Sequence, residues 1–197
     1  MSRLIETIKL QDGRFNNLRY HEQRMNHSLK ELYKVDGTAE LNTFLESLNY
    51  PQKGLYKCRL VYDSYSKTVE FIPHTFKLIT SLTLIEANAI LYDHKYSNRA
   101  PIDYLMDKRG GGDDILIIKD GWVTDCSYAN IVFKSGSKWY TPHTCLLKGT
   151  MRESLLDAGA IEVQPIKVHD IKKFEKFKLI NAMLGFDGAE CDISNIL

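Results

Sequence analysis

Residues 120–133 read DGWVTDCSYANIVF, and this stretch decides how the second half of the chain folds. Asp120-Gly121 is a strong hairpin signal between two apolar runs, which are typical of paired strands. Another apolar run begins at Ile131, so a further strand follows after a short connection. Asp125 falls between these last two strands. We therefore predict a strand meander with a carboxylate at the end of one strand.

Asp125 has two interpretations. A carboxylate at a strand end is usually a turn or capping residue. The small and polar residues that follow it, up to Asn130, also leave room for a planar ligand. A pyridinium nitrogen needs a buried acceptor of this kind, because a carboxylate keeps the nitrogen protonated and preserves the ring as an electron sink. The residues alone leave both interpretations open.

The rest of the chain extends this pattern in both directions. In the first half, the alternating residues around the turn Asp12-Gly13 predict a hairpin, and helical spacing begins at Leu18. Further elements are expected as a second helix capped by Thr38 over residues 38–48, strands over 54–63, 67–74 and 76–85, a helix starting near Pro101, the meander over 113–142 and a helix over 148–159. The fold class is therefore α/β, with two small domains spanning residues 1–88 and 89–197.

Composition narrows the function. The 197 residues are 44% hydrophobic and 26% charged, which is enough apolar content for a globular core. Lys plus Arg total 26 and Asp plus Glu total 25, so the net charge of +1 gives no reason to expect nucleic acid or an anionic membrane as a partner. A small molecule is the better expectation for a substrate.

The expected location and metal content follow from the lack of a signal peptide, a membrane span and closely spaced cysteines. The N-terminal residues alternate charged and apolar side chains and do not resemble a secretory signal, and no segment has the roughly 18 to 20 apolar residues of a membrane span. The cysteines are widely spaced, which argues against a zinc site or a disulfide framework: Cys58, Cys126, Cys145 and Cys191. We expect a cytoplasmic protein with reduced thiols and no metal.

Lys95 is the first candidate for covalent chemistry, in LYDHKYSNRAPIDYL at residues 91–105. A lysine becomes nucleophilic when burial or nearby cations lower the pKa of its amine, and His94 and Arg99 are close to it in sequence. Most lysines are simply solvated surface residues. Lys95 therefore needs support from other parts of the chain.

Phosphate binding is suggested at two places. Gly149 precedes a predicted helix whose first backbone N–H groups belong to Thr150 and Met151, and such a helix start attracts anions. A glycine before a helix is more often a simple helix boundary. His21 and Arg24 share one helix face at i, i+3, where Arg24 is suited either to a phosphate or to a surface ion pair. The glycines at 110–112 lack a following GK[ST], so we interpret them as a flexible connection.

Taken in order, several weak motifs resemble one family. They are ETIKLQDGRFNNLRYHEQRM, KYSNR, DGWVTDCSYANIVF, YTPHTCLLKGTMRESLL and LINAMLGF, and together they cover nearly the whole chain. This set resembles the class IV aminotransferases, the fold-type IV pyridoxal-phosphate enzymes. Within the family the details look most like the 4-amino-4-deoxychorismate lyases, in Asn98-Arg99 after the lysine, GWVT before the acid, Met151 and the NAM near the end.

The resemblance implies a fold and a set of roles. The fold would be that of D-amino acid aminotransferase, with a small N-terminal α/β domain and a larger C-terminal mixed-sheet domain. Lys95 would form the Schiff base with pyridoxal 5'-phosphate, and Asp125 would bind the ring nitrogen. The phosphate pocket would contain Arg24, Thr150, Met151, Asn181 and Ala182. Arg59, Arg99 and Arg152 are candidate partners for substrate carboxylates, although each is as readily a surface charge.

The implied activity is elimination of pyruvate from 4-amino-4-deoxychorismate to give 4-aminobenzoate, as in folate biosynthesis. A branched-chain or D-amino acid transaminase and an inactive cofactor-binding relative are the alternatives. Two departures bear on this choice: Asp125 stands where the family commonly has Glu, and the resemblance begins at Glu6 without the usual preceding aspartate-glycine segment. The family also implies a homodimer, with the cofactor between the two domains near the subunit contact.

Overall fold

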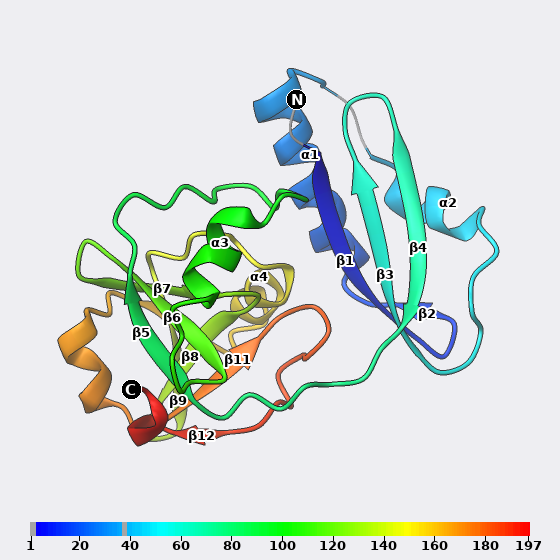
Figure 1. Ribbon diagram of the computed structural model, residues 1–197. Helices are drawn as coiled ribbons and strands as arrows, with labels where there is room; N and C mark the ends of the chain where they lie inside the picture. The colour runs from blue at the N-terminus through cyan, green and yellow to red at the C-terminus, as the bar shows by residue number, and fades with distance from the viewer. Residues whose placement is uncertain (1–2, 37–38) are drawn as a thin grey trace. The chain divides into compact units, whose positions relative to one another are not determined.

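The structure, a computed structural model, describes residues 3–36 and 39–197 (Figure 1). Its contacts divide the chain into two compact units. Unit 1 contains the chain up to Phe76 together with His94–Asn98, and unit 2 contains Lys77–Asp93 and Arg99–Leu197. The units differ from the domains expected at residues 1–88 and 89–197, because long-range strand pairing, which local patterns do not reveal, assigns residues 77–93 to unit 2 and Lys95 to unit 1.

Unit 1 is built on an antiparallel sheet with the strand order β2-β1-β3-β4. Its strands are β1 (Leu4–Gln11), β2 (Arg14–Phe15), β3 (Leu55–Tyr62) and β4 (Lys67–Pro73). Asp12 and Gly13 both have positive φ, at 48° and 77°, as the expected two-residue hairpin turn requires. Every second residue of β1 from Leu4 to Leu10 is buried, which confirms the predicted alternation.

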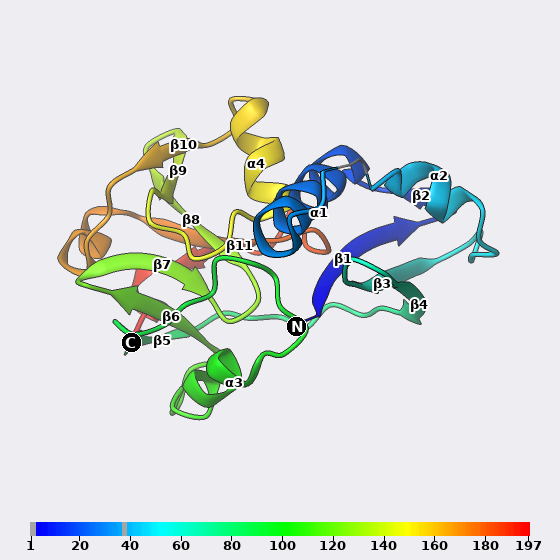
Figure 2. The same ribbon diagram turned by 90° about the horizontal axis from the view of Figure 1, so that it is seen from above.

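Two helices cover one face of this sheet, as Figure 2 shows from above: α1 (Leu18–Tyr33) and α2 (Leu41–Glu46). Apolar side chains of both helices and of β1 and β3 form one buried core, including Ile8, Met25, Leu41 and Leu60. The second helix was expected over residues 38–48 and begins at Leu41. Its predicted cap, Thr38, lies outside the described residues.

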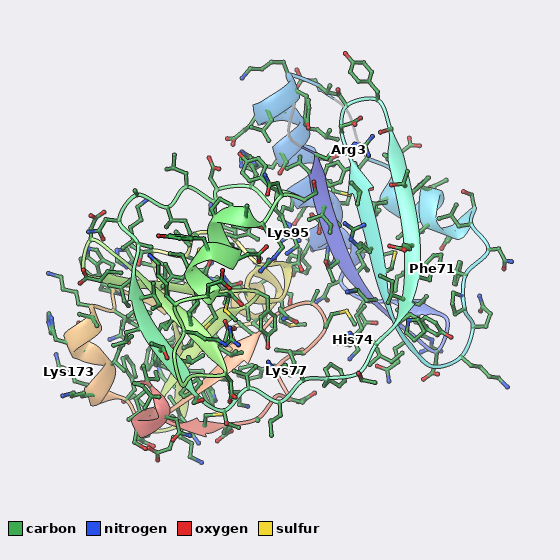
Figure 3. The ribbon with its side chains drawn as sticks, in the orientation of Figure 1. Arg3, Phe71, His74, Lys77, Lys95 and Lys173 are labelled. Atoms are coloured by element: carbon green, nitrogen blue, oxygen red, sulfur yellow. The ribbon has the colours of Figure 1, made fainter. Side chains whose placement is uncertain are left out.

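The segment that carries Lys95 returns to the edge of β1. Ile5 N donates to Lys95 O at 2.9 Å, Ser97 N donates to Arg3 O at 2.8 Å, and Leu4 forms an antiparallel bridge with Tyr96. Figure 3 labels Lys95 beside the N-terminal half of β1. Lys95 is therefore held on the strand that opens the chain, although it is 90 residues away in sequence.

Unit 2 is built on a mixed sheet. Eight strands take part: β5 (Leu82–Glu86), β6 (Asp114–Lys119), β7 (Trp122–Cys126), β8 (Asn130–Ser135), β9 (Lys138–Pro142), β10 (Glu162–Gln164), β11 (Lys176–Ile180) and β12 (Cys191–Asp192). The order along the sheet is β10-β9-β8-β7-β6-β5, with β11 between β8 and β12. The β5–β6 and β9–β10 pairs are parallel and the others antiparallel. The predicted meander is thus confirmed, whereas the strand expected over residues 76–85 begins only at Leu82.

The two faces of unit 2's sheet carry different helices. On one face, α4 (Thr150–Asp157) packs against Val132 and Ile180. On the other face, the 3-10 helix η1 (Val168–Lys173) closes a larger core around Ile131 and Phe133. The remaining helices are α3 (Ala100–Met106) and the short η2 (Ile193–Asn195). Over residues 3–36 and 39–197, no helix is long and apolar enough to cross a membrane.

Candidate active site

A charged residue, Glu6, lies on the buried face of β1, one position after the residue that bonds Lys95. Its side chain is fully buried. It accepts from Arg24 at both oxygens, with Nε–Oε1 at 2.9 Å and Nη2–Oε2 at 2.5 Å, and contacts His21 Nδ1 at 2.6 Å. Burial raises the pKa of Glu6, but the Arg24 charge and the His21 hydrogen bond outweigh burial and lower the pKa to about 2. Glu6 is therefore ionised.

His21 is fully buried beside this carboxylate. Burial lowers the pKa of His21; the hydrogen bond to Glu6 opposes this, and the positive charges of Arg24 and Lys95 lower the pKa further. An ionised Glu6 can only accept, so the imidazole carries a proton on Nδ1. The effect of Lys95 on His21 indicates that its amine lies within electrostatic range of this cluster. Unit 1 thus gathers Lys95, Arg24, His21 and Glu6, and places His21 and Arg24 on one face of α1 as expected.

His94, the residue before Lys95, is tied to α1. Its Nδ1 lies 3.0 Å from Ser28 Oγ, and its Nε2 lies 3.3 Å from Glu31 Oε2. The imidazole is only 4% exposed, whereas Glu31 is half exposed. These contacts anchor the segment that presents Lys95 to the helix that carries Arg24.

In unit 2, Asp125 is a buried carboxylate near the end of β7. Asn130 Nδ2 donates to its Oδ1 at 2.8 Å, and Leu147 N donates to its Oδ2 at 2.9 Å. Burial raises the pKa of Asp125 to about 6, against the lowering effect of these two hydrogen bonds and of the Arg152 charge. Asp125 is thus a strong hydrogen-bond acceptor that is mostly ionised at pH 7.

The start of α4 is connected to Asp125 through the loop that precedes the helix, because Leu147 in this loop donates to Asp125. Gly149 is the N-cap residue, and as a glycine it has no side chain with which to cap the helix. Thr150 is buried and Met151 half-buried in its first turn. The backbone N–H groups of a first helical turn lack helical partners, and the helix dipole adds positive potential. This end of α4 therefore has the chemistry of an anion site.

Asn181 and Ala182 follow β11, at a turn that Asn181 stabilises. Its Oδ1 accepts from Met183 N and Leu184 N, both at 2.9 Å, and its Nδ2 donates to Tyr128 O at 3.3 Å. Tyr128 belongs to the connection between Asp125 and Asn130. Hydrogen bonds in unit 2 therefore tie Asp125 to the loop before α4, and tie the connection that follows Asp125 to the turn at Asn181.

The three arginines proposed for substrate carboxylates have different surroundings. Arg152 is buried and donates to Thr141 Oγ1, Pro142 O and Glu153 Oε1. Its guanidinium therefore fastens α4 to β9 inside unit 2, and it is not the solvated first-turn residue that the sequence alone also allowed. Since each of its three guanidinium nitrogens already donates within the protein, Arg152 is the least suited of the three to bind a substrate.

Arg99 and Arg59 are more accessible. Arg99 Nη2 donates to Ser127 O at 2.8 Å, and its Nε lies 3.7 Å from Asp103. Arg59 lies on β3, in unit 1, with Nη1 3.8 Å from Glu70 Oε2. Each side chain is about a third exposed, at 33% for Arg99 and 38% for Arg59. Both remain able to receive an anion.

Two residues of these clusters were not singled out from the sequence, Glu6 and Asn130. Glu6 resembles any charged residue of an alternating strand, and only its position on the buried face marks it. Asn130 opens β8 and faces Asp125 across the strand pair, where their Cα atoms are partners. Asn130 could have been found only by pairing the predicted strands before and after the short connection, since that pairing places it opposite Asp125.

The residues 3–187 match the protein family described as amino-transferase class IV. The chain belongs to this family. Its fold is accordingly that of the fold-type IV pyridoxal-phosphate enzymes, with a small N-terminal sheet and a larger mixed C-terminal sheet, as expected from the resemblance.

Individual class IV relatives agree with this assignment. A functionally uncharacterised protein of Haemophilus influenzae is 39% identical over 184 residues, covering 92% of this chain and 98% of its own. A crystal structure from Haemophilus somnus 129PT, described as a "putative 4-amino-4-deoxychorismate lyase", has 32% identity and a TM-score of 0.87 over 94% of this chain and 98% of its own. A hypothetical aminotransferase of Mycobacterium tuberculosis in its PLP-bound form shares the fold, with 16% identity, 100% and 83% coverage and a TM-score of 0.76.

Proposed function

We propose that the protein is a pyridoxal-phosphate enzyme, and that its reaction is the elimination of pyruvate from 4-amino-4-deoxychorismate. The observation that supports cofactor binding most directly is the state of Asp125. A buried carboxylate that is tied at both oxygens and mostly ionised has the chemistry that a protonated pyridine nitrogen requires. The lyase assignment is supported by the relative from Haemophilus somnus and by the Asn98-Arg99 and Met151 signatures.

The remaining donors suit the other parts of the cofactor. The first turn of α4 at Thr150 and Met151, with its helix dipole, suits a phosphate dianion, and so does the guanidinium of Arg24. Lys95 supplies a primary amine, which reacts with an aldehyde. Each functional group of pyridoxal phosphate thus has residues of suitable chemistry. They are Lys95 for the aldehyde, Asp125 for the ring nitrogen, and Arg24, Thr150, Met151, Asn181 and Ala182, which we propose for the phosphate pocket.

When bound, the cofactor supplies an electron sink that stabilises negative charge at the substrate carbon bearing the amine. Asp125 would keep the ring nitrogen protonated and so preserve that sink. Lys95 would hold the cofactor covalently before substrate arrives and then act as the base that removes the proton from that carbon. Arg99 and Arg59 are the candidates for the two substrate carboxylates.

The atoms balance without a further reactant. Lys95 removes one proton from the ring carbon, the ether bond between that ring and the enolpyruvyl group breaks, and the departing enolpyruvyl carbon gains a proton to become pyruvate. The ring becomes aromatic as 4-aminobenzoate. Aromatisation makes the elimination strongly favourable once the proton is gone.

The cofactor assignment is tested by absorption spectroscopy of the full-length protein after incubation with pyridoxal phosphate. We expect a visible band that borohydride bleaches, and no such band in Lys95→Ala. Lys119→Ala is the matched control, since Lys119 lies in unit 2 and donates to Ile90 O. A wild-type protein that stays colourless would contradict the proposal, whereas a coloured protein without turnover would be the inactive cofactor-binding relative.

The reaction is tested with 4-amino-4-deoxychorismate and no keto acid. We expect stoichiometric pyruvate and 4-aminobenzoate. The transaminase alternative, favoured by the family to which the chain belongs, predicts instead that branched-chain or D-amino acids react only when a keto acid is present. Turnover of amino and keto acid pairs without any pyruvate release from 4-amino-4-deoxychorismate would overturn the lyase proposal.

We also propose that the protein is a homodimer. Several apolar side chains of unit 2 are exposed, including Leu78, Leu91 and Tyr104 at 66%, 79% and 62%. A partner subunit would remove such side chains from water, which is favourable. Sedimentation equilibrium should give twice the chain mass, and a monomer at micromolar concentration would contradict this proposal.

A further inference from the structure

The side chain of Asn130 is fixed in one orientation by its two partners. Asn130 is 5% exposed, and its Nδ2 donates both to Asp125 Oδ1 at 2.8 Å and to Leu147 O at 2.9 Å. Both partners are acceptors, so the amide nitrogen must face them. The amide oxygen, Oδ1, consequently points away from Asp125 and toward Gly149.

Leu147 closes this network from the other side. Its N–H donates to Asp125 Oδ2 at 2.9 Å, while its C=O accepts from Asn130. One loop residue therefore bonds both members of the Asp125–Asn130 pair. Leu147 is two residues before Gly149, so the carboxylate and the start of α4 are joined through a very short piece of chain.

Gly149 is required by space and not by backbone conformation. Its φ of −69° and ψ of 140° are accessible to any residue. A Cβ at this position would lie only 1.9 Å from Asn130 Oδ1. Serine, threonine, asparagine and aspartate are the preferred N-cap residues, yet each would clash here. The carboxamide oxygen of Asn130 thus occupies the space that a Cβ at position 149 would need.

From these contacts we propose that Asn130 is a positioning residue, which sets the distance between Asp125 and the first turn of α4, and that Gly149 is its obligatory counterpart. The inference rests on the proposed function, in which Asp125 binds the ring nitrogen and the first turn of α4 binds the phosphate of one cofactor. A rigid cofactor has a fixed distance between these two groups, so the protein must match it. Asp125 is shorter than the glutamate common in the family, which leaves less reach for adjustment.

Other groups near Asp125 do not replace Asn130 in this role. Arg152 is the charged neighbour, and its guanidinium is bonded to Thr141, Pro142 and Glu153. Cys126 and Cys145 stay neutral near pH 7, because burial raises the pKa of both thiols. Asn130 is thus the residue that bonds Asp125 and also packs against the N-cap of α4.

The first experiment measures coupling between the two positions in the full-length protein without cofactor. Urea unfolding is compared for wild type, Gly149→Ala, Asn130→Ala and the double variant. We expect Gly149→Ala to be strongly destabilising in wild type and almost neutral when residue 130 is alanine. Equal costs of Gly149→Ala in both backgrounds would overturn the proposed contact. Gly111→Ala is the control, since no atom lies within 4 Å of a Cβ there.

The second experiment separates positioning from packing. Asn130→Asp keeps the shape of the side chain but removes its N–H donors. In carbon-detected NMR titration of the unloaded protein, both Asn130→Ala and Asn130→Asp should raise the titration midpoint of Asp125, with the larger rise in Asn130→Asp because a second carboxylate faces it. Unchanged titration midpoints of Asp125 in both variants would show that the hydrogen bond from Asn130 does not affect Asp125.

The third experiment uses pyridoxine 5'-phosphate, which has the ring and the phosphate but no aldehyde to react with Lys95. We expect Asn130→Ala to weaken its binding at least tenfold, while the weak binding of inorganic phosphate changes less than twofold. An equal loss for both probes would indicate a general structural role and overturn the positioning proposal. If wild type binds neither pyridoxine 5'-phosphate nor pyridoxal phosphate, the proposed function fails. The urea unfolding experiment on residues 130 and 149 then still tests whether the two residues are in contact.

Discussion

At the residue scale, the cluster around Glu6 shows how a buried charge is kept in a small core. Glu6 shares the inner face of β1 with Leu4 and Ile8, where an isolated charge would be very costly. Arg24 and His21 supply the compensating hydrogen bonds and charge. The arrangement also restrains Arg24, because two of its N–H groups are directed to one carboxylate.

Removing the charge of Glu6 should strongly destabilise the folded protein. We expect Glu6→Gln to lower the free energy of unfolding at pH 7 by about 3–5 kcal/mol, because it removes the carboxylate that balances the mostly buried charge of Arg24. Glu70→Gln is the matched control on the same sheet: its contact with Arg59 is exposed and 3.8 Å long, so the change should stay below about 1 kcal/mol. Urea unfolding of both variants measures this. Similar small effects would show that the Glu6 cluster is not energetically important.

Asp125 should make stability depend on pH. Its folded-state pKa is raised from 3.8 to about 6, so its protonation favours the folded state, and this contribution is lost as pH rises through 6. Between pH 4.5 and 7.5 the unloaded wild type should therefore lose about 2 kcal/mol relative to Asp125→Asn, which cannot titrate. Urea unfolding of both proteins at the two pH values tests the sign. A difference that does not change with pH would contradict it.

Residue chemistry of this kind was only partly predictable. Lys95, Asp125 and Arg24 could be proposed because amine, carboxylate and guanidinium chemistry is readable from residue type and from motif order. Glu6 and Asn130 could not, because their roles depend on which face of a strand is buried and on which residue lies opposite. Arg152 was proposed for substrate binding, but its burial depends on how α4 packs against β9, which the sequence does not show.

At the element scale, the hairpin between β6 and β7 sets the position from which Asp125 extends. Its turn, Asp120-Gly121, has φ of 52° and 78°, and Asp120 N is also bonded by Asn88 Oδ1 at 2.8 Å. Hairpins of this length need positive φ at both turn residues. Helix and strand positions of this region follow directly from such local signals, which is why the meander and α4 were predictable.

The turn can be tested without disturbing packing, since nothing lies within 4 Å of a Cβ at Gly121. Gly121→Ala should lower the free energy of unfolding by about 1 kcal/mol, because alanine is strained at a φ of 78°. Gly111→Ala has equal space and no positive φ, and should change stability by less than about 0.5 kcal/mol. Thermal unfolding compares the two variants. Equal stabilities would show that the turn conformation carries no cost.

Unit boundaries, in contrast, were not readable from local patterns. The predicted break fell between residues 88 and 89, just before the stretch that contains Lys95. In the structure, β5 pairs in parallel with β6 across a connection of 27 residues that includes the Lys95 segment, and this pairing assigns residues 82–86 to unit 2. Parallel pairing over such a distance leaves no short-range signature.

At the scale of the whole molecule, the chain passes from one unit to the other three times. It leaves unit 1 after Phe76, returns for His94–Asn98 and leaves again at Arg99. Unit 1 is therefore incomplete without a five-residue piece that comes from the middle of the sequence. The proposed cofactor residues are divided accordingly, with the covalent lysine in unit 1 and the ring-nitrogen acceptor in unit 2.

The division of the proposed cofactor residues between the two units predicts which regions exchange amide hydrogens more slowly when the ligand is bound. When pyridoxal phosphate is added, hydrogen exchange should slow both at the first turn of α4 in unit 2 and at the Lys95 segment in unit 1, because binding stabilises every region that it contacts. In Lys95→Ala the unit 1 effect should weaken, while inorganic phosphate should affect only phosphate-binding regions. Protection confined to a single unit would contradict the proposed division of roles.

The contact between Asn130 and Gly149 also constrains how this sequence can change over generations. A lineage that gains any side chain at position 149 first has to shorten residue 130, since the opposite order passes through a protein with a severe clash. The replacement at position 130 then releases Asp125, so the carboxylate must be lengthened or supported anew before the intermediate is useful. Positions 130 and 149 are therefore expected to change together and in one order, and homologues with a side chain at position 149 and an asparagine at position 130 should be rare.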